Sequence, residues 1–329
     1  MTQLSSEPLP GVYLIGAPKA GTTSVAAWLA GHPDVHVSQP KEPFFWASDY
    51  PRMREHYGFA DREAYASLFR NETAGDKRYS VDASTTYLYS NDAVPNILEH
   101  VADPRFLVCV RNPVDLLVSY HRTQVVALNE PENDFARAWR RGRPAAGDTS
   151  ALDAKLLDYD TVGRQGAAVE RVQRLAGPER VHAILFDDLV TDPRQVWDRL
   201  QGFLGLAPQP LPVASRHNPS NKTARWKGLR RTMHRPPASI APAVRRLRQW
   251  ARTTDSAAVG RAKNLLWKPT ERPRIDGDLR RELEATFAED VDLLGRLLGR
   301  DLTGWTRDVS AGPADDPARA DAPPSEVTS

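Results

Sequence analysis

The sequence predicts an α/β fold in three layers, in which flanking helices cover both faces of a central, mostly parallel sheet. Three observations predict it. Short apolar runs typical of buried strands recur along the chain, segments with helical spacing follow them, and Gly, Pro, Asn or Asp mark the turns between them. With 329 residues, of which 40% are apolar, the chain can form one large core.

The first strand-to-helix unit lies near the start of the sequence. An apolar run at 12–15 leads into a loop with Gly16 and Gly21 at its ends and Lys19 inside it, and Thr22 opens an Ala-rich helical segment. Glycines permit a tight turn, and a helix start offers unpaired N–H groups and the positive end of its dipole. The unit therefore predicts a P-loop-like anion site.

The position of the lysine limits which ligands this loop could bind. In the triphosphate-binding pattern G-x-x-x-x-G-K-[ST] the lysine follows the second glycine, whereas Thr22 stands there in this sequence. The difference argues against a P-loop nucleotide kinase, which we keep as one alternative function. A non-catalytic module that binds anions or a membrane surface is another. The structural alternative is an ordinary strand-to-helix turn.

A second unit of the same kind follows the apolar run at 106–110. Arg111 stands where the predicted strand ends, Asn112 can cap the next helix, and Pro113 fits its first turn. Ser119 lies two turns further on. Because ligands of open α/β sheets bind at the carboxyl ends of the strands, we expect Arg111 to bind a phosphate there.

Together the two loops resemble those of the sulfotransferases that use 3′-phosphoadenosine 5′-phosphosulfate (PAPS). The family motifs, roughly P-K-[ST]-G-T-T and R-N-P-x-x-x-x-x-S-Y, occur in the right order, with Ala20 where Ser or Thr is common. The resemblance implies that Arg111 and Ser119 bind the 3′-phosphate. It also implies that the 5′-phosphosulfate is bound by Lys19, Ala20, Gly21, Thr22, Thr23 and Ser24.

The segment at 39–46 resembles the Lys-Glu-x-x-Phe-Phe element of the carbohydrate and peptide branch of that family, in which the glutamate is proposed as general base. The resemblance assigns this role to Glu42 and places Lys41 on the acceptor side. The aromatic residues that follow Glu42 would shield its carboxylate from water, which suits proton transfer. The structural alternative is an exposed ion pair of Lys41 with Glu42.

A hydroxyl-rich stretch follows the alternating segment at 79–82. It resembles the acidic-x-Ser-Pro-x-Tyr element of the same branch, with Thr85 in the proline position. The resemblance places Asp82 and Ser84 on the acceptor side of the site. The structural alternative is a turn that these two side chains stabilise.

The charge that moves in such a reaction sets the roles of these residues. A sulfuryl group passes in line from a phosphate oxygen to an acceptor oxygen or nitrogen, so we expect Lys19 to donate to the bridging oxygen and Glu42 to take the proton. His36 and His121 are the alternatives for the base, because the small-molecule branch of the family uses a histidine. The product is 3′,5′-adenosine bisphosphate, and no metal ion is required.

The acceptor is left open between a small molecule, a carbohydrate and a lipid, because variable loops form acceptor pockets. The resemblance at Lys41 and Glu42 slightly favours a sugar-like alcohol. We expect no nucleic-acid partner.

The later elements alternate in the same way. An acidic-acidic-leucine turn begins at Asp187, as in the family. Gln165 stands where family members often carry a tyrosine, which leaves the role of this position open. We expect helices and one buried strand at 165–176, 181–186, 193–204 and 277–298.

Positive charge is concentrated in a Pro- and Arg-rich segment at 222–274, which holds 15 Lys and Arg against 2 Asp and Glu. We interpret it as an insertion in a single sulfotransferase domain at 11–305, with a flexible start at 1–10 and a disordered tail at 306–329. An anionic partner fits such a segment.

The candidate partners of this basic segment are a membrane surface, an acidic acceptor and a second copy of the chain in a homodimer. In the family a loop in this region closes over the nucleotide, which makes Arg216 and Lys222 candidate cofactor-binding residues.

Composition also suggests a location. The sequence has no leader pattern and no apolar run of about eighteen residues, so we expect a cytoplasmic protein. The single cysteine, Cys109, falls in a predicted strand, so we expect a buried thiol. Frequent Ala, Arg, Asp and Pro are typical of a GC-rich bacterial genome.

Overall fold

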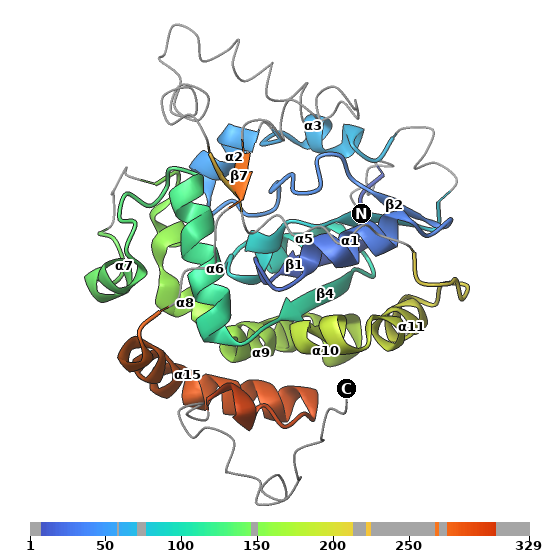
Figure 1. Ribbon diagram of the computed structural model, residues 1–329. Coiled ribbons are helices and arrows are strands. Elements are labelled where there is room, and N and C mark those ends of the chain that lie inside the picture. Colours follow the sequence, from blue (N-terminus) through green and yellow to red (C-terminus); the bar gives the residue numbers. More distant parts are fainter. Residues whose placement is uncertain are drawn as a thin grey trace, which may run out of the picture.

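A five-stranded sheet forms the centre of the protein, and helices flank it (Figure 1). The computed structural model describes residues 8–57, 59–70, 77–145, 151–212 and 275–306, and the backbone alone at 222–224 and 267–269. The strands of the sheet are β1 (Val12–Gly16), β2 (Val35–Val37), β3 (Tyr79–Asp82), β4 (Arg105–Val110) and β5 (Val181–Leu185).

Helices connect the strands. None of the helices in the described ranges is long and apolar enough to cross a membrane. The longer helices are α1 (Thr22–Ala30), α5 (Ala93–His100), α6 (Pro113–Val126), α9 (Gln165–Ala176), α11 (Pro193–Leu204) and α15 (Gly277–Leu298). The shorter ones are α2 (Pro51–Tyr57), α3 (Arg62–Ser67), α7 (Phe135–Arg141), α8 (Tyr159–Gly163) and α10 (Phe186–Thr191). Single helical turns are η1 (Thr85–Leu88), η2 (Ala154–Leu157), η3 (Pro178–Arg180) and η5 (Thr303–Trp305).

The strand order is β2-β3-β1-β4-β5, and each neighbouring pair in this sheet is parallel. Because crossovers between parallel strands are almost always right-handed, this strand order places α1 on one face and α5 and α9 on the other, and the contact between α5 and α9 agrees with this. On the first face Trp28 of α1 meets Trp197 of α11 with ring centroids 6.4 Å apart. On the second face α5 packs against α9, and α15 covers α9. The predicted three-layer α/β/α fold with a parallel sheet is confirmed.

The two central strands show why the apolar runs become buried strands. All five residues of β1 are buried, and β4 is buried after its first residue, because layers cover both faces of the sheet. Cys109 on β4 is fully buried, and burial raises the pKa of its thiol to about 12. The predicted buried thiol is therefore confirmed.

The predicted later helices match α9, α11 and α15, and local caps explain where they begin. Asp192 accepts a hydrogen bond from the N–H group of Gln195 and starts α11. The predicted strand at 181–186 ends one residue early, because Phe186 already begins α10. Helical periodicity and capping residues therefore identify these elements closely.

Within the basic segment the structure describes two short strands. The strands β6 (Lys222–Ala224) and β7 (Trp267–Pro269) pair in an antiparallel way and form a separate two-stranded sheet. The rest of the predicted insertion at 222–274 lies outside the described residues, as do residues 1–7 of the predicted flexible start and 307–329 of the predicted tail.

Candidate active site

The loops after all five strands of the main sheet contribute to the candidate site, as expected for the carboxyl edge of a parallel sheet. Each of these five segments supplies at least one residue to the interactions described below, and we name one from each. The residues, in the chain order of their strands, are Lys19, Glu42, Thr85, Arg111 and Phe186.

The first loop is fixed at its start. The N–H group of Ala17 donates a hydrogen bond of 2.6 Å to the carbonyl oxygen of Cys109, which ties the loop to β4. At Gly16 an added Cβ would lie 2.7 Å from Cβ of Leu88 in η1, so this close approach requires a glycine. The loop therefore leaves β1 in one direction, pressed against η1.

The second glycine ends the loop under α10. Gly21 has a φ of 94°, and an added Cβ would lie 2.6 Å from Cδ1 of Leu189. In the described part of the chain, the backbone N–H groups of Gly21, Thr22 and Thr23 form no hydrogen bond, and the first turn of α1 carries no acidic residue. Such N–H groups and the positive end of a helix dipole are typical of anion-binding sites, and the binding of an anion by this loop stays a prediction.

The rest of the first loop differs in exposure. Ala20 is fully buried, Thr23 is exposed and Ser24 is partly exposed. Thr22 is buried, and its Oγ1 accepts a hydrogen bond of 3.3 Å from Nζ of Lys41. The groups that this loop could offer to a ligand are therefore mainly its backbone N–H groups, the ammonium group of Lys19 and the hydroxyl groups of Thr23 and Ser24.

Arg111 lies beside the first loop. Its guanidinium donates a hydrogen bond of 3.1 Å to the carbonyl oxygen of Lys19 and stacks on the ring of Phe186, 4.4 Å from the ring centroid. The strand-end position that the sequence predicts for this arginine is confirmed. Ser119 lies in the helix that follows, α6, and is partly exposed. Its contact with a phosphate stays a prediction.

Several positive charges surround Lys19. Burial lowers the pKa of the Lys19 ammonium group, and the guanidinium of Arg111 lowers it further. Lys41 and Arg122 act in the same direction, whereas the carboxylate of Glu42 opposes them. A cluster of four cations and one carboxylate has a net positive field, which an anionic ligand would neutralise.

Glu42 is held by two side chains at this edge. Its Oε1 accepts a hydrogen bond of 3.1 Å from Nζ of Lys41, and its Oε2 accepts one of 3.2 Å from the hydroxyl of Thr85. The Glu42 side chain is 30% exposed, so its carboxylate can reach a ligand. The pair is therefore more than a surface ion pair, because Lys41 also binds Thr22 of the first loop.

The aromatic residues after Glu42 turn inward. Phe44 packs on Tyr57 and Trp46 on Tyr65, and both are buried. The contacts of the Glu42 carboxylate described above are polar, so hydrogen bonds rather than an aromatic shield hold it. The aromatic cluster anchors the loop instead.

A fully buried carboxylate lies beneath this loop. Asp82 accepts hydrogen bonds from the N–H and hydroxyl groups of Ser84, at 3.0 and 2.6 Å, and from the hydroxyl groups of Tyr65 and Tyr87, both at 2.9 Å. Burial raises the pKa of this carboxyl group to about 6, although the hydrogen bonds it accepts oppose the shift.

The three hydroxyl groups that donate to Asp82 also accept hydrogen bonds from the loop of Glu42. The hydroxyl of Ser84 accepts from the N–H of Phe44, that of Tyr87 from the N–H of Trp46, and that of Tyr65 from the indole N–H of Trp46. Asp82 and Ser84 have no exposed surface. This favours the turn-stabilising alternative over direct contact with an acceptor.

The two alternative bases make other contacts. The ring Nε2 of His36 lies 3.0 Å from the carbonyl oxygen of Leu68, and that of His121 lies 2.9 Å from the carbonyl oxygen of Glu132. Burial lowers the pKa of His121. Glu42 is therefore the better candidate, since it contacts Lys41 and Thr85 at the strand ends.

The structure describes neither of the two remaining candidate cofactor-binding side chains. Arg216 and the side chain of Lys222 lie outside the described residues. Within the described ranges, no group of three or more His, Cys, Asp or Glu side chains is arranged to hold a metal ion.

Two residues of the site were not predicted. Phe186 supplies the ring under Arg111, and the amide of Gln165 binds the backbone of Arg111. The sequence contains an indication that Gln165 makes such a contact. This residue precedes Ala168 and Val169 by three and four positions, so it lies on the apolar face of α9. A polar residue on such a face requires a hydrogen-bond partner.

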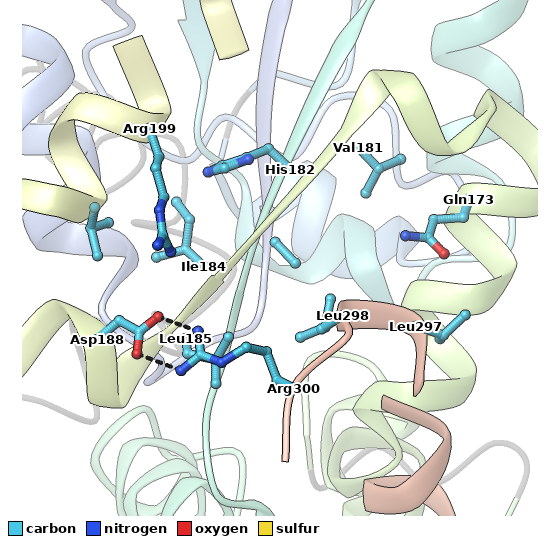
Figure 2. A pocket seen from close by; sticks show the side chains of 12 residues that line it. Gln173, Val181, His182, Ile184, Leu185, Asp188, Arg199, Leu297, Leu298 and Arg300 are labelled. Carbon is cyan, nitrogen blue, oxygen red and sulfur yellow. Dashed lines mark hydrogen bonds and ion pairs between the residues drawn. The ribbon is translucent and has the colours of Figure 1, made fainter. Parts of the chain in front are cut away.

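A separate cavity of about 280 Å³ opens at the outer edge of β5 (Figure 2). None of the predicted site residues lines it. The guanidinium of Arg300 pairs with both carboxylate oxygens of Asp188 there, at 2.7 and 2.9 Å. The neighbouring Asp187 accepts a hydrogen bond of 2.8 Å from the indole of Trp305. These contacts attach α10, which covers Gly21, to the end of the described chain.

Comparisons with known proteins identify sulfotransferases as relatives of this chain. The chain is 24% identical over 204 residues to the bifunctional heparan sulfate N-deacetylase/N-sulfotransferase 3 of Homo sapiens. It is 27% identical over 205 residues to the heparan sulfate glucosamine 3-O-sulfotransferase 3B1 of Mus musculus. Each match covers 61% of this chain, but only 23% and 47% of the respective relatives.

A solved structure supports the fold. The crystal structure of a sulfotransferase from Alicyclobacillus acidocaldarius superimposes with a TM-score of 0.62 at 24% identity, and the match covers 91% of this chain and 100% of the other. A sequence profile described as "Sulfotransferase family" matches residues 10–210, which is more than half of the chain. The resemblance to the carbohydrate branch of these enzymes is thus confirmed, and the protein belongs to the sulfotransferase family.

Proposed function

We propose that this protein transfers a sulfuryl group from PAPS to an acceptor hydroxyl. The observation that carries the proposal is the cluster at the strand ends. Lys19, Lys41, Arg111 and Arg122 lie near a helix start whose first N–H groups have no hydrogen-bond partner among the described residues, and Glu42 supplies the carboxylate. Such a cluster suits a ligand with two anionic groups and an acceptor that must lose a proton.

The residues on the donor side fit PAPS. The loop from Lys19 to Ser24 offers an ammonium group and backbone N–H groups for the 5′-phosphosulfate, and Arg111, with Ser119, offers a guanidinium for the 3′-phosphate. When bound, PAPS supplies an activated sulfuryl group, whose S–O bond to the 5′-phosphate breaks as the acceptor oxygen forms a new one. Lys19 would stabilise the negative charge on the departing phosphate oxygen.

On the acceptor side Glu42 would take the proton that the attacking hydroxyl loses. The Lys41 and Thr85 contacts orient its two oxygens, and its partial exposure leaves room for the incoming hydroxyl. Lys41 would also link the base to Thr22 at the start of α1, because its Nζ contacts both side chains.

The relatives indicate an acceptor class. Their names describe sulfation of heparan sulfate and its glucosamine units, so we propose a sugar-like alcohol as the acceptor. Because the matches cover less than half of these relatives, their other activities are not carried over. A screen of sugars, lipids and phenols with radiolabelled PAPS would identify the acceptor, and label transfer to no sugar would contradict this class.

Calorimetry tests the donor without knowledge of the acceptor. We expect 3′,5′-adenosine bisphosphate to bind at least tenfold more tightly than ATP with Mg²⁺, a difference of about 1.4 kcal/mol. ATP binding equal to or tighter than that of the bisphosphate would contradict the proposal and favour the kinase alternative. Binding of neither nucleotide would favour a non-catalytic module.

A further inference from the structure

The backbone of Arg111 lies where the sheet ends. The last residue pair between β4 and β5 joins Val110 to Leu185, and the residue after β5, Phe186, already begins α10. Arg111 therefore cannot use the neighbouring strand as a hydrogen-bond partner. Buried or half-buried backbone groups in this situation need another partner.

The amide of Gln165 takes the place of that strand. Its Oε1 accepts a hydrogen bond of 2.9 Å from the N–H of Arg111, and its Nε2 donates one of 2.6 Å to the carbonyl oxygen of the same residue. A carboxamide can bind both groups at once because it carries a donor and an acceptor side by side. Gln165 is 1% exposed, so water does not compete for these bonds.

The helix that carries Gln165 is itself fixed. The carboxylate of Asp290 in α15 accepts hydrogen bonds of 2.7 and 2.9 Å from the N–H groups of Gly166 and Ala167, in the first turn of α9. Gln165 is the first residue of this helix. The position of its amide is therefore set by the packing of α9 against α15, and not by Arg111 alone.

The position of the Arg111 backbone also determines where its side chain lies. The guanidinium is confined between the ring of Phe186 and the carbonyl oxygen of Lys19, so a shift of the Arg111 backbone would move the guanidinium out of both contacts. We propose that Gln165 is a positioning residue that places Arg111 for the 3′-phosphate of the donor nucleotide. This inference rests on the proposed function, since it assumes that Arg111 binds that phosphate.

The test compares two nucleotides that differ by the 3′-phosphate. Gln165→Met keeps the volume of the side chain and removes both hydrogen bonds. We expect the affinity for 3′,5′-adenosine bisphosphate, measured by calorimetry, to fall about tenfold. The reason is that a displaced Arg111 guanidinium would make weaker charged hydrogen bonds to the 3′-phosphate. The affinity for 5′-AMP, which lacks the 3′-phosphate, should change by less than about twofold.

A matched control separates positioning from general stability. Gln201 in α11 is 3% exposed, and its Oε1 accepts a hydrogen bond of 2.6 Å from the N–H of Gln209. Gln201→Met removes a buried amide of the same kind away from the strand ends. We expect it to lower the unfolding temperature and to leave the ratio of the two nucleotide affinities unchanged.

Two further variants keep the test decisive if Gln165→Met does not fold. Gln165→Asn is too short to reach both backbone groups of Arg111, and it should reduce the preference for the bisphosphate to an intermediate value. In an Arg111→Ala background, Gln165→Asn should change the ratio by less than about twofold, because the residue through which it acts has been removed.

The outcomes distinguish this inference from the proposed function. A wild-type protein that binds the bisphosphate no better than 5′-AMP overturns the assignment of Arg111, and this inference with it. A wild-type preference that survives in the folded Gln165 variants overturns the positioning role alone. Equal losses for both nucleotides would also overturn it, since they indicate a general structural role.

Discussion

The donor side and the base side of the candidate site are held in different ways. The donor loop follows β1 and Arg111 follows β4, two central and adjacent strands, and hydrogen bonds to backbone groups fix both segments. The loop of Glu42 follows the edge strand β2 and is held by side chains, through hydroxyl groups that converge on the buried Asp82.

This difference predicts different sensitivities. A loop held by backbone hydrogen bonds depends on glycines and close packing, so its stability should change little with pH and should decrease when a side chain is enlarged. A loop held by a buried carboxylate should respond to protonation and to single polar substitutions, because a hydrogen-bond network loses more than one bond when its hub is changed. The following variants test the two halves separately.

The largest effect is expected at the base. Glu42→Gln keeps the shape of the side chain but cannot accept a proton, so kcat should fall by about 10²- to 10⁴-fold, the usual contribution of a general base. The affinity for 3′,5′-adenosine bisphosphate should stay within about twofold of the wild type, because the donor side is unchanged. Retained turnover would assign the base elsewhere, with His36 and His121 as the next variants.

The second effect concerns the stability of the base side. The pKa of Asp82 is raised to about 6 by burial, above its value of about 3.9 in an unfolded chain. The folded protein therefore binds this proton more tightly, and the resulting stability is complete below about pH 3.9 and lost as the pH rises to about 6. The size of the change is about 3 kcal/mol.

Chemical unfolding of the wild type and of Asp82→Asn at several pH values measures this contribution. The stability of the wild type relative to the variant should decrease between about pH 4 and about pH 6 and then stay level. Asp188→Asn is a control with the opposite sign, because the hydrogen bonds from Arg300 lower the pKa of Asp188, so the stability of the wild type relative to this variant should increase with pH. For Asp82→Asn, a difference that grows with pH would contradict the prediction.

The third effect concerns the donor loop. Gly21→Ala forces a side chain onto a residue with a φ of 94° and places its Cβ 2.6 Å from Leu189, so the loss of stability should be about 2 kcal/mol. Nucleotide affinity should fall as well. Gly299→Ala is the control, since Gly299 also has a positive φ, of 60°, but an added Cβ meets nothing within 4 Å. If both variants behave alike, α10 does not constrain the loop.

The smallest effect is a pH dependence of donor binding. The pKa of Lys19 is lowered by burial and by the charge of Arg111, so this ammonium group loses its proton at a lower pH than an ordinary lysine. The affinity for the bisphosphate should therefore weaken as the pH rises, and the decline should begin at a lower pH than it would for an ordinary lysine. Lys19→Arg should remove this decline, because arginine stays charged.

The sequence predicted the parts of the site that depend on local pattern. The apolar runs and the turn residues place Lys19 and Arg111 at strand ends, and parallel strands bring such ends to one edge. Helix boundaries such as those of α9 follow from periodicity and caps. These inferences need no knowledge of which helix packs on which.

The interactions that join distant segments were not predictable in this way. In the sequence, Asp82 has the features of a turn residue. Only the structure shows that Tyr65 and Tyr87 pack around it and donate hydrogen bonds to its carboxylate. The bond of Gln165 to Arg111 joins residues 54 positions apart. Such contacts depend on how α3, η1 and α9 meet the sheet, which a single sequence does not specify.

The origin of the site residues in five different strand-end loops has a thermodynamic consequence. Because the segment after each strand contributes, no fragment that lacks an edge strand can assemble the whole site, and the proposed nucleotide binding would be linked to the folding of the entire sheet. A nucleotide at a hundred times its dissociation constant would stabilise the native state by about 2.7 kcal/mol. The unfolding temperature should therefore rise with nucleotide concentration, which turns thermal denaturation into a binding assay that needs no acceptor.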